Sequence, residues 1–322
     1  MRILAWVLAV PGLVWALLRI SGWSPGPVAV VLPFTPYAAI GSLIVLVVIS
    51  VMRQWRAAVV AGVATALLAG CVVGRVLPDR DRGPRDGVAL TVLSANMLKG
   101  GADPEAIVRR VRDEDAGVLA LQEFTAAGQA ALAKAGLGEL MPYASIAPQR
   151  ASDPFGTTGS AVYSRFPLTG SGFRLNYGGF QQAYATVTVP GAKPVVVESV
   201  HPAAPHSLDV LGDWRRDLKD QPGPGRILAG DFNATLDHKE LRDLIGRGYR
   251  DAAATMGKGL VPSWGPYGDR PIPPITIDHV LVDRTIGISR YAGYGLPGSD
   301  HRMILAAVVL PAGQTGSIQM LR

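Results

Sequence analysis

The sequence predicts an α/β protein made of two packed, mixed β-sheets with flanking helices, preceded by about three transmembrane helices. Two observations support this. Of 322 residues, 48% are hydrophobic and the mean hydropathy is +0.24, which is high for a soluble enzyme, and most of the apolar excess lies before Pro78. Beyond residue 88, many short apolar runs with strand character alternate with few helical patterns, so the sheets cannot be all parallel.

Charge and cysteine content exclude little. The formal net charge of +6 is carried mainly by arginine, without a block of like charges. This scatter favours the codon usage of a GC-rich genome over a nucleic-acid or anionic-lipid site. The single cysteine, Cys71, rules out an intramolecular disulfide and a zinc site built on cysteines.

Residues 1–77 are predicted to form the membrane region, with helices near residues 3–20, 28–52 and 57–76. Each contains an uncharged apolar segment, and a spanning helix needs about 20 apolar residues. The second segment is long enough and the third is adequate. The first is short unless its flanking arginines snorkel to the membrane surface.

Membrane orientation follows from the arginines between these helices. The short link from Arg53 to Arg56 is the best candidate for a cytoplasmic loop by the positive-inside rule. With three spans, everything after Val76 is then extracytoplasmic, although the basic linker 79–85 argues the other way. Leu68–Cys71 is similar to a bacterial lipobox, and we favour the alternative that Cys71 is a small apolar residue inside the third helix. Both interpretations export the domain.

A polar linker, 78–87, leads into a domain predicted to span residues 88–311, followed by a loose tail at 312–322. Asp103 followed by Pro104 marks one helix start, with Asp at the N-cap and Pro at the first helical position. Further helices are expected at 125–135, from residue 207 and from about 237. Strands are expected at 88–95, 117–121, 159–164, 183–189, 195–200, 227–230, 275–282 and 303–310.

Polar side chains end several of these apolar runs. Asp231 and Asn233 follow one strand two positions apart, so both could face the same point. Hard oxygen donors suit Mg²⁺ or Mn²⁺, and histidines near acids suit proton transfer. Together the set could hydrolyse a phosphoester. Its members are Asn96, Glu123, His201, Asp231, Asn233, Asp278, Asp300 and His301.

Each of these signals has a structural alternative when taken alone. Asp231 and Asn233 could form an Asx-turn, and His201 could be an ordinary loop histidine before a proline. Asp300 could cap a helix, and Asp278 could be a buried, hydrogen-bonded acid. Their order along the chain decides between these alternatives.

In that order, the motifs resemble the endonuclease/exonuclease/phosphatase superfamily, which includes pancreatic-type deoxyribonucleases, abasic-site nucleases, inositol phosphatases and sphingomyelinases. The resemblance implies the four-layer sandwich of DNase I and metal-dependent cleavage of phosphoesters. The matching motifs are Ser94–Asn96, Leu121–Glu123, Gly159–Arg165, His201, Gly230–Asn233, Ile277–His279 and Ser299–His301.

The resemblance also implies roles for these residues. Glu123 would be the main ligand of Mg²⁺ (or Mn²⁺), with Asn96 and Asp300 completing the metal site. Pro262-Ser263-Trp264 departs from the family pattern, because many members carry a Thr-aromatic pair there. The role of Ser263 is therefore open.

For the catalytic groups, the resemblance implies that His301, oriented by Asp278, acts on the attacking water or stabilises the phosphate. Asp231 would assist proton transfer, and Asn233 would hold a phosphoryl oxygen. His201 would protonate the leaving group.

The substrate stays open at this stage. Two features favour a lipid phosphate over nucleic acid. The domain lies close to the predicted membrane helices, and the predicted rim loops are poor in Lys and Arg. These loops are 202–205, 265–274 and 291–297, and the cations there are Arg270 and Arg290. The arrangement is similar to VanJ-type teicoplanin-resistance membrane proteins of actinobacteria, which implies lipid-linked pyrophosphates such as polyprenyl pyrophosphate. The alternatives are an exported metal-dependent endonuclease and a non-catalytic binder of a cell-wall precursor.

Overall fold

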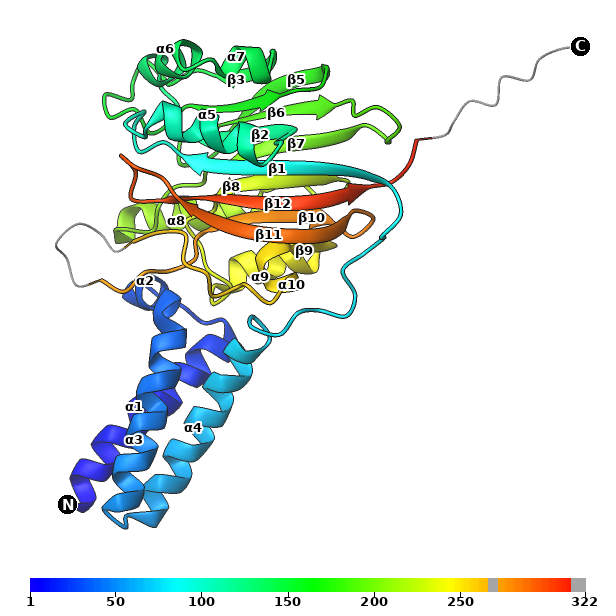
Figure 1. The fold of residues 1–322 in the computed structure, drawn as a ribbon. Coiled ribbons are helices and arrows are strands. Elements are labelled where there is room, and N and C mark those ends of the chain that lie inside the picture. Colours follow the sequence, from blue (N-terminus) through cyan, green and yellow to red (C-terminus); the bar gives the residue numbers. More distant parts are fainter. Residues whose placement is uncertain (266–271, 314–322) are drawn as a thin grey trace, which may run out of the picture.

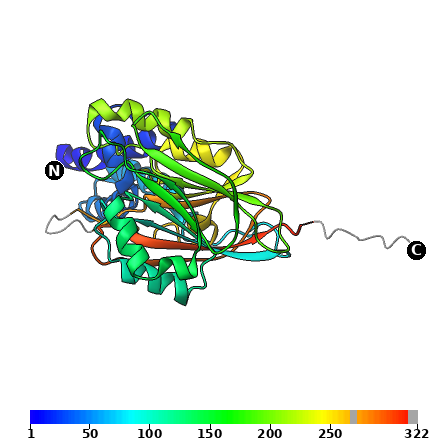
Figure 2. The same ribbon diagram turned by 90° about the horizontal axis from the view of Figure 1, so that it is seen from above.

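The computed structural model describes residues 1–265 and 272–313 of the chain (Figure 1). A bundle of apolar helices stands at one end of a domain built from two sheets. Figure 2 shows the two sheets between helices that lie on opposite outer faces, which gives four layers. The predicted fold class is therefore confirmed.

Each sheet has six strands and is mixed. Only β1 with β2, and β7 with β8, pair in parallel, and the other neighbours are antiparallel. The first sheet has the order β11 (Gly287–Gly295), β12 (Arg302–Leu310), β1 (Val88–Asn96), β2 (Val118–Gln122), β4 (Ser160–Ser164) and β3 (Tyr143–Ala147). The second has the order β5 (Leu168–Leu175), β6 (Gln181–Val187), β7 (Val195–Val200), β8 (Arg226–Asp231), β10 (Asp278–Asp283) and β9 (Tyr249–Asp251).

Alternation along each strand divides the apolar side chains between two cores. On β1, Leu90 and Val92 enter the core between the sheets, whereas Leu93 and Ala95 face the helices outside the first sheet. Those helices are α5 (Pro104–Asp113), α6 (Ala126–Lys134) and α7 (Leu137–Leu140). The second sheet is covered by α8 (Leu208–Lys219) and α9 (Lys239–Gly246), and α10 (Ala252–Thr255) follows β9.

Side-chain caps mark the starts of α5 and α6, and the cap at Asp103 was predicted from the sequence. Asp103 caps α5 by accepting a hydrogen bond from the Glu105 backbone N–H at 2.9 Å, with Pro104 at the first helical position. Thr125 caps α6 in the same way through the Gly128 N–H at 3.1 Å.

Within the described residues, three helical segments are long and apolar enough to cross a membrane: α1 (Arg2–Ser21), the segment Pro27–Val51, and α4 (Trp55–Val73). The second was expected as one helix but is divided into α2 (Pro27–Val31), η1 (Leu32–Phe34) and α3 (Thr35–Val51). Pro33 and Pro36 lack the N–H groups that a continuous helix needs, which accounts for the tighter turn between α2 and α3.

The sequence patterns did not predict every strand. The strands β3, β5, β9 and β11 were not predicted, and 291–297 was expected as a rim loop although Tyr291–Gly295 belongs to β11. Asp278 and His279 were expected in the middle of a strand but begin β10. Ala312 and Gly313 pair with residues 191–192, whereas 314–322 of the predicted tail and 266–271 of the predicted rim loop, including Arg270, lie outside the described residues.

Candidate active site

The predicted site residues meet at one edge of the sandwich, and the strand directions explain why. Parallel strands end on the same side, so β1 and β2 bring Asn96 and Glu123 to one edge of the first sheet. In the second sheet, β7 and β8 likewise deliver His201 and Asp231. Antiparallel β10 and β12 begin where these strands end.

The beginnings of β10 and β12 therefore add Asp278 and His301 to the same edge. Asp278 lies directly opposite Asp231 in the register of β10 and β8. Gly230 precedes Asp231 at a point where a Cβ would lie 2.1 Å from the Val200 carbonyl oxygen, so only glycine fits there.

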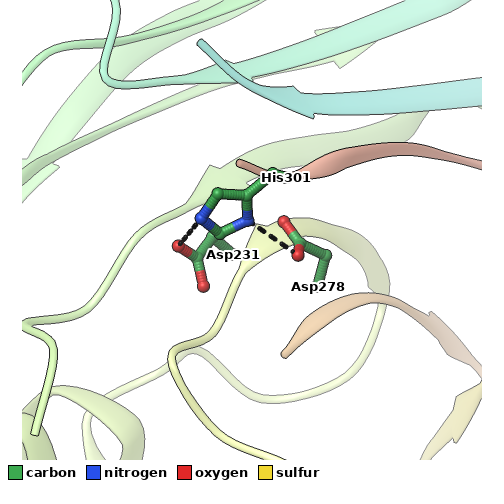
Figure 3. A group of neighbouring side chains, drawn as sticks. All are labelled: Asp231, Asp278 and His301. Atoms are coloured by element: carbon green, nitrogen blue, oxygen red, sulfur yellow. Dashed lines mark hydrogen bonds and ion pairs between the residues drawn. The ribbon is translucent and has the colours of Figure 1, made fainter. Parts of the chain in front are cut away.

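The centre of the site is a buried histidine between two carboxylates (Figure 3). The Nδ1 atom of His301 is 2.9 Å from Oδ2 of Asp278, and its Nε2 atom is 3.6 Å from Oδ2 of Asp231. Burial by itself would lower the pKa of His301, but Asp278 and Asp231 outweigh it and raise that pKa to about 10. The imidazole is therefore held as a cation at neutral pH.

Asp231 is shared by several groups. Its Oδ1 accepts the Asn233 backbone N–H at 2.8 Å, and its Oδ2 accepts a hydrogen bond from Nδ2 of Asn96 at 3.1 Å. Burial raises the pKa of Asp231 to about 6, because the loss of solvent outweighs the attraction of His301 and His201. A carboxyl with this pKa is a suitable general base near neutral pH.

His201 lies on the other side of Asp231. Its Nε2 is 3.7 Å from Asp231 Oδ2, and its ring packs edge-on against Phe180 with the ring centroids 4.7 Å apart. Burial lowers the pKa of His201 below its ordinary value, and Asp231 only partly opposes this. In this state His201 is neutral at pH 7.

Glu123 lies just beyond β2 in a left-handed backbone conformation, with φ 51°. Its Oε2 accepts the Lys99 N–H at 2.8 Å, and its Oε1 accepts a hydrogen bond from Nδ2 of Asn96 at 3.2 Å. Burial raises the pKa of Glu123 above its ordinary value despite these hydrogen bonds. Strain at such a residue marks a position held for function.

The Asn96 amide has a defined orientation because its Oδ1 accepts the Leu98 backbone N–H at 2.9 Å. Its Nδ2 therefore faces Glu123 and Asp231, and Asn96 connects these two carboxylates as a hydrogen-bond donor. Asn96 was expected to be a ligand of the metal ion. The structure places its donor group, rather than a free oxygen, toward the site.

Asp300 is the second acid, after Glu123, in this part of the site. Its Oδ2 accepts the Trp264 indole N–H at 2.9 Å, whereas its Oδ1 is buried and makes no hydrogen bond within the described residues. A buried carboxylate oxygen is costly without a partner, and a cation is the partner that a carboxylate prefers.

Two groups of side chains could hold a divalent cation. Ligand atoms of Asp231, Asp278 and His301 all lie within 4.8 Å of one another. Both ring nitrogens of His301 already face carboxylates, however, and its raised pKa opposes the loss of a proton that metal binding requires. The Oδ1 of Asp300, which makes no hydrogen bond and lies 4.0 Å from His301 Nε2, and the Glu123 carboxylate fit a hard cation better.

Asn233 also has a left-handed backbone, with φ 48°, and its Nδ2 donates to the Pro202 carbonyl oxygen at 3.0 Å.

The role of Ser263 was left open by the sequence, and the structure shows what this side chain contacts. Its buried hydroxyl accepts the backbone N–H groups of Ile277 at 3.0 Å and Asp278 at 2.9 Å, which positions the Asp278 carboxylate.

The site opens into a cavity of about 820 Å³. Six of the predicted residues line it, namely Glu123, His201, Asp231, Asn233, Asp300 and His301, while Asn96 and Asp278 lie behind them in hydrogen-bonding contact. The N-terminal helical region also lines this cavity, through Ala29 and Val30 of α2 and Pro33 and Phe34 of η1. This contact was not predicted from the sequence, because apolar residues in a predicted membrane helix look alike.

A base of suitable pKa, a neutral and a cationic histidine, and acids with an unsatisfied oxygen define a hydrolase of phosphoester bonds. Comparison with protein families agrees. Residues 93–301 match the Endonuclease/Exonuclease/phosphatase family, and the chain belongs to that family.

Solved structures of similar fold include an endonuclease/exonuclease/phosphatase from Beutenbergia cavernae DSM 12333. It has 19% identity and a TM-score of 0.57, and the match covers 69% of this chain and 72% of that one. A humanized D. rerio TDP2 matches with 17% identity and a TM-score of 0.53, covering 68% and 98%. A mannosyl-6-phosphatase from Bacteroides thetaiotaomicron VPI-5482 has 16% identity and a TM-score of 0.50, covering 69% and 100%. None of the curated protein sequences compared with the chain matches it.

Proposed function

We propose that this protein is a membrane-anchored, divalent-metal-dependent hydrolase of a lipid-linked phosphate, with its catalytic domain outside the cytoplasm. One observation carries the proposal. The cavity that contains His301 and Asp231 has a wall built by the membrane-proximal segment of Ala29, Val30, Pro33 and Phe34. A phosphate bound at the catalytic end is therefore enclosed by the same helix that leads toward the bilayer.

Glu123 and Asp300 would hold the metal ion, for which Mg²⁺ is the first candidate and Mn²⁺ the second, because both acids offer hard oxygen ligands. When bound, the cation neutralises charge on the phosphoryl oxygens. Asn96 keeps the Glu123 carboxylate beside Asp231 through its two hydrogen bonds.

The chain's own residues account for the proton transfers. Asp231, with a pKa of about 6, is ionised at neutral pH and takes a proton from the attacking water. The His301 cation, fixed by Asp278, stabilises the negative charge that develops on the phosphoryl group. A phosphate bound beside His201 raises the pKa of that ring again, so it can protonate the departing oxygen.

The cavity lining favours a lipid over a nucleic acid. Among its described residues, Lys99 is the single lysine or arginine. Arg290, expected at the rim, instead pairs with Glu114 at 2.6 Å. Nucleases gain much of their affinity from cationic contacts with several phosphates, which this lining lacks.

The positions of the arginines support an extracytoplasmic domain. The bundle's N-terminus lies at the end remote from the domain (Figure 1). Exposed Arg2, Arg53 and Arg56 flank the ends of α1, α3 and α4, whereas Arg19 and Arg75 at the domain end are buried against Asp237. The positive-inside rule then places the remote end in the cytoplasm. A reporter fused after residue 313 tests this, and activity of a cytoplasm-specific reporter would reverse the assignment.

Within this proposal we include the VanJ-type role, in which the substrate is a lipid-linked pyrophosphate of cell-wall synthesis such as polyprenyl pyrophosphate. Expression of the full chain in a teicoplanin-sensitive host should then raise its resistance, and the Glu123→Ala variant should not. Equal susceptibility with and without the active protein would remove the resistance role.

The decisive experiment uses the full-length protein in nanodiscs with Mg²⁺ and a substrate panel of polyprenyl pyrophosphate, sphingomyelin, a phosphoinositide and plasmid DNA. We expect phosphate release from the polyprenyl substrate that is abolished in Glu123→Ala and His301→Ala and retained in Glu139→Ala, an exposed acid outside the cavity lining. Nicking of the plasmid alone would instead identify a nuclease. Metal-independent binding without turnover would identify a non-catalytic binder.

A further inference from the structure

A second, smaller cavity lies on the membrane side of the first. It has a volume of about 200 Å³ and shares two lining residues with the active-site cavity, the buried Pro33 of η1 and the half-buried Ile275. Its other walls include Tyr37 and Ile40 of α3. The two cavities are therefore neighbours on either side of the pair Pro33–Ile275.

We propose that the hydrocarbon chain of the substrate leaves the active-site cavity between Pro33 and Ile275 and runs through the second cavity along α3 into the bilayer. This inference rests on the proposed function, and it names a tail-binding subsite and the class of lipid that fits it. The phosphate stays at Asp231 and His301 while the chain remains in an apolar path.

The first argument is the continuity of the apolar surface. Val30 lines the active-site cavity, Tyr37 and Ile40 line the second one, and Ile44 follows one helical turn further on. Tyr37, Ile40 and Ile44 follow the helical spacing of α3, and the four side chains are 43%, 40%, 60% and 59% exposed. A chain lying along this face stays out of water from the catalytic site to the membrane interior, and each buried CH₂ contributes about 0.8 kcal/mol.

The second argument concerns the opposite wall. Ile275 pairs with Trp264 through two backbone hydrogen bonds of 3.0 Å, and the indole of Trp264 donates to Asp300 at 2.9 Å. The tail wall is thus connected, through Trp264, by hydrogen bonds to an acid of the candidate metal site. This connection fixes the position of the tail relative to the phosphate.

The charge of the second cavity also favours an apolar chain over a headgroup. Among the described residues that line the second cavity, Arg75 is the one ionised side chain, and its Nη1 is 2.7 Å from the buried carboxylate of Asp237. The cation is therefore satisfied by the protein and does not attract a headgroup into this cavity. A narrow apolar path of this kind suits a single prenyl or alkyl chain rather than the paired chains of a diacyl lipid.

Thiol protection tests the path without relying on turnover. The full chain in detergent carries Ile40→Cys in a Cys71→Ser background, and alkylation is followed with farnesyl phosphate, inorganic phosphate or neither. We expect farnesyl phosphate to slow alkylation about tenfold and inorganic phosphate to leave it unchanged. The matched control is Val76→Cys, which is 45% exposed and outside both cavity linings, and whose alkylation should not respond.

Equal alkylation with and without farnesyl phosphate, or equal slowing in the Val76→Cys control, would overturn the proposed path. Kinetics give a second readout. In Ile40→Trp, the ratio of kcat/KM for farnesyl phosphate to that for methyl phosphate should fall about tenfold, since the indole fills the path. The ratio should not change in Val59→Trp, on the exposed face of α4.

Different results would contradict the hydrolase function and the tail path. If the wild-type protein hydrolyses neither these two phosphates nor polyprenyl pyrophosphate, the proposed hydrolase function is wrong, and thiol protection still decides whether a chain occupies the path. If it hydrolyses both and Ile40→Trp leaves their ratio unchanged, the hydrolase stands and the tail path is wrong. Faster hydrolysis of dioleoyl phosphatidate than of farnesyl phosphate would contradict the single-chain preference.

Discussion

Arg19, near the end of α1, and Asp237, in the loop after β8, form a buried ion pair with Nε 2.6 Å from Oδ1. Arg75, just beyond α4, binds the same carboxylate. Asp237 follows Asp231 and Asn233 on one short loop, so the loop that supplies the candidate base also holds two of the N-terminal helices. The N-terminal helix bundle is therefore part of the support of the candidate site.

Replacing Asp237 by asparagine should destabilise the full-length protein by about 3–5 kcal/mol, because two arginines would then be buried without their counter-charge. Denaturant unfolding in detergent measures the loss. The matched control is Asp243→Asn, which removes the exposed pair with Lys239 and should cost about 1 kcal/mol or less. Equal losses in the two variants would show that the buried pair does not secure the bundle.

The protonation of His238, next to Asp237, determines how acid affects the stability of this junction. Its Nδ1 accepts the Thr235 N–H at 2.9 Å, so its Nε2 carries the proton and donates to the Ala29 carbonyl of α2 at 2.8 Å. Burial lowers the pKa of His238 below its ordinary value of 6.5. The unfolded state therefore binds more protons below pH 6.5, and stability falls as the pH drops from 6.5 toward the folded pKa.

The expected loss is about 1.4 kcal/mol per pH unit within that window. It is measured as the difference in stability between the wild type and His238→Gln at pH 7.5 and pH 5.5. The difference isolates His238 from His279, whose raised pKa acts in the opposite direction. A difference that does not change with pH would contradict a neutral His238 at the junction.

Asp278 should set the alkaline limit of activity. It faces His301 Nδ1 at 2.9 Å and helps to raise the pKa of His301 to about 10. In Asp278→Asn that support is lost, so His301 gives up its proton at a lower pH and the alkaline limb of kcat/KM moves down. We expect a loss of about 10²–10⁴-fold at pH 8, with a smaller loss at pH 6.

Glu139→Ala, outside the site, serves as the control and should keep the wild-type profile. If Asp278→Asn lowers activity by the same factor at every pH between 6 and 9, the carboxylate does not act through the charge of His301.

The clustering of the candidate site residues was largely predictable from sequence, because polar residues such as Glu123 and Asp231 stand at the ends of buried apolar strands, a pattern that packing alone does not produce. The edge strands were harder. β5 exposes much of both faces and contains two glycines, and β11 carries glycines, the exposed Arg290 and the half-buried Tyr294, so neither shows a clear alternation. Tertiary pairing, not local preference, makes them strands.

The contact between the N-terminal helices and the domain could not be predicted from the sequence, for a different reason. Asp237 and His238 directly precede α9 and look like an ordinary helix start in the sequence. Their partners, Arg19, Arg75 and Ala29, lie more than 150 positions away in a region where each resembles a routine membrane-flanking or apolar residue. Only the packing of the bundle against the domain gives these residues a function.

Ser263 provides the last prediction, because its hydroxyl accepts the backbone N–H groups of both Ile277 and Asp278. Ser263→Ala leaves two buried donors without an acceptor, which should cost about 1–3 kcal/mol in stability and let Asp278 shift away from His301. Ser263→Thr keeps the hydroxyl and should restore both properties. Thermal unfolding and the alkaline limb of the pH–rate profile are the measurements. If Ser263→Ala loses stability but keeps the wild-type profile, the serine supports the fold without positioning Asp278. If the alkaline limb moves in Ser263→Ala and returns in Ser263→Thr, it positions the carboxylate that keeps His301 charged.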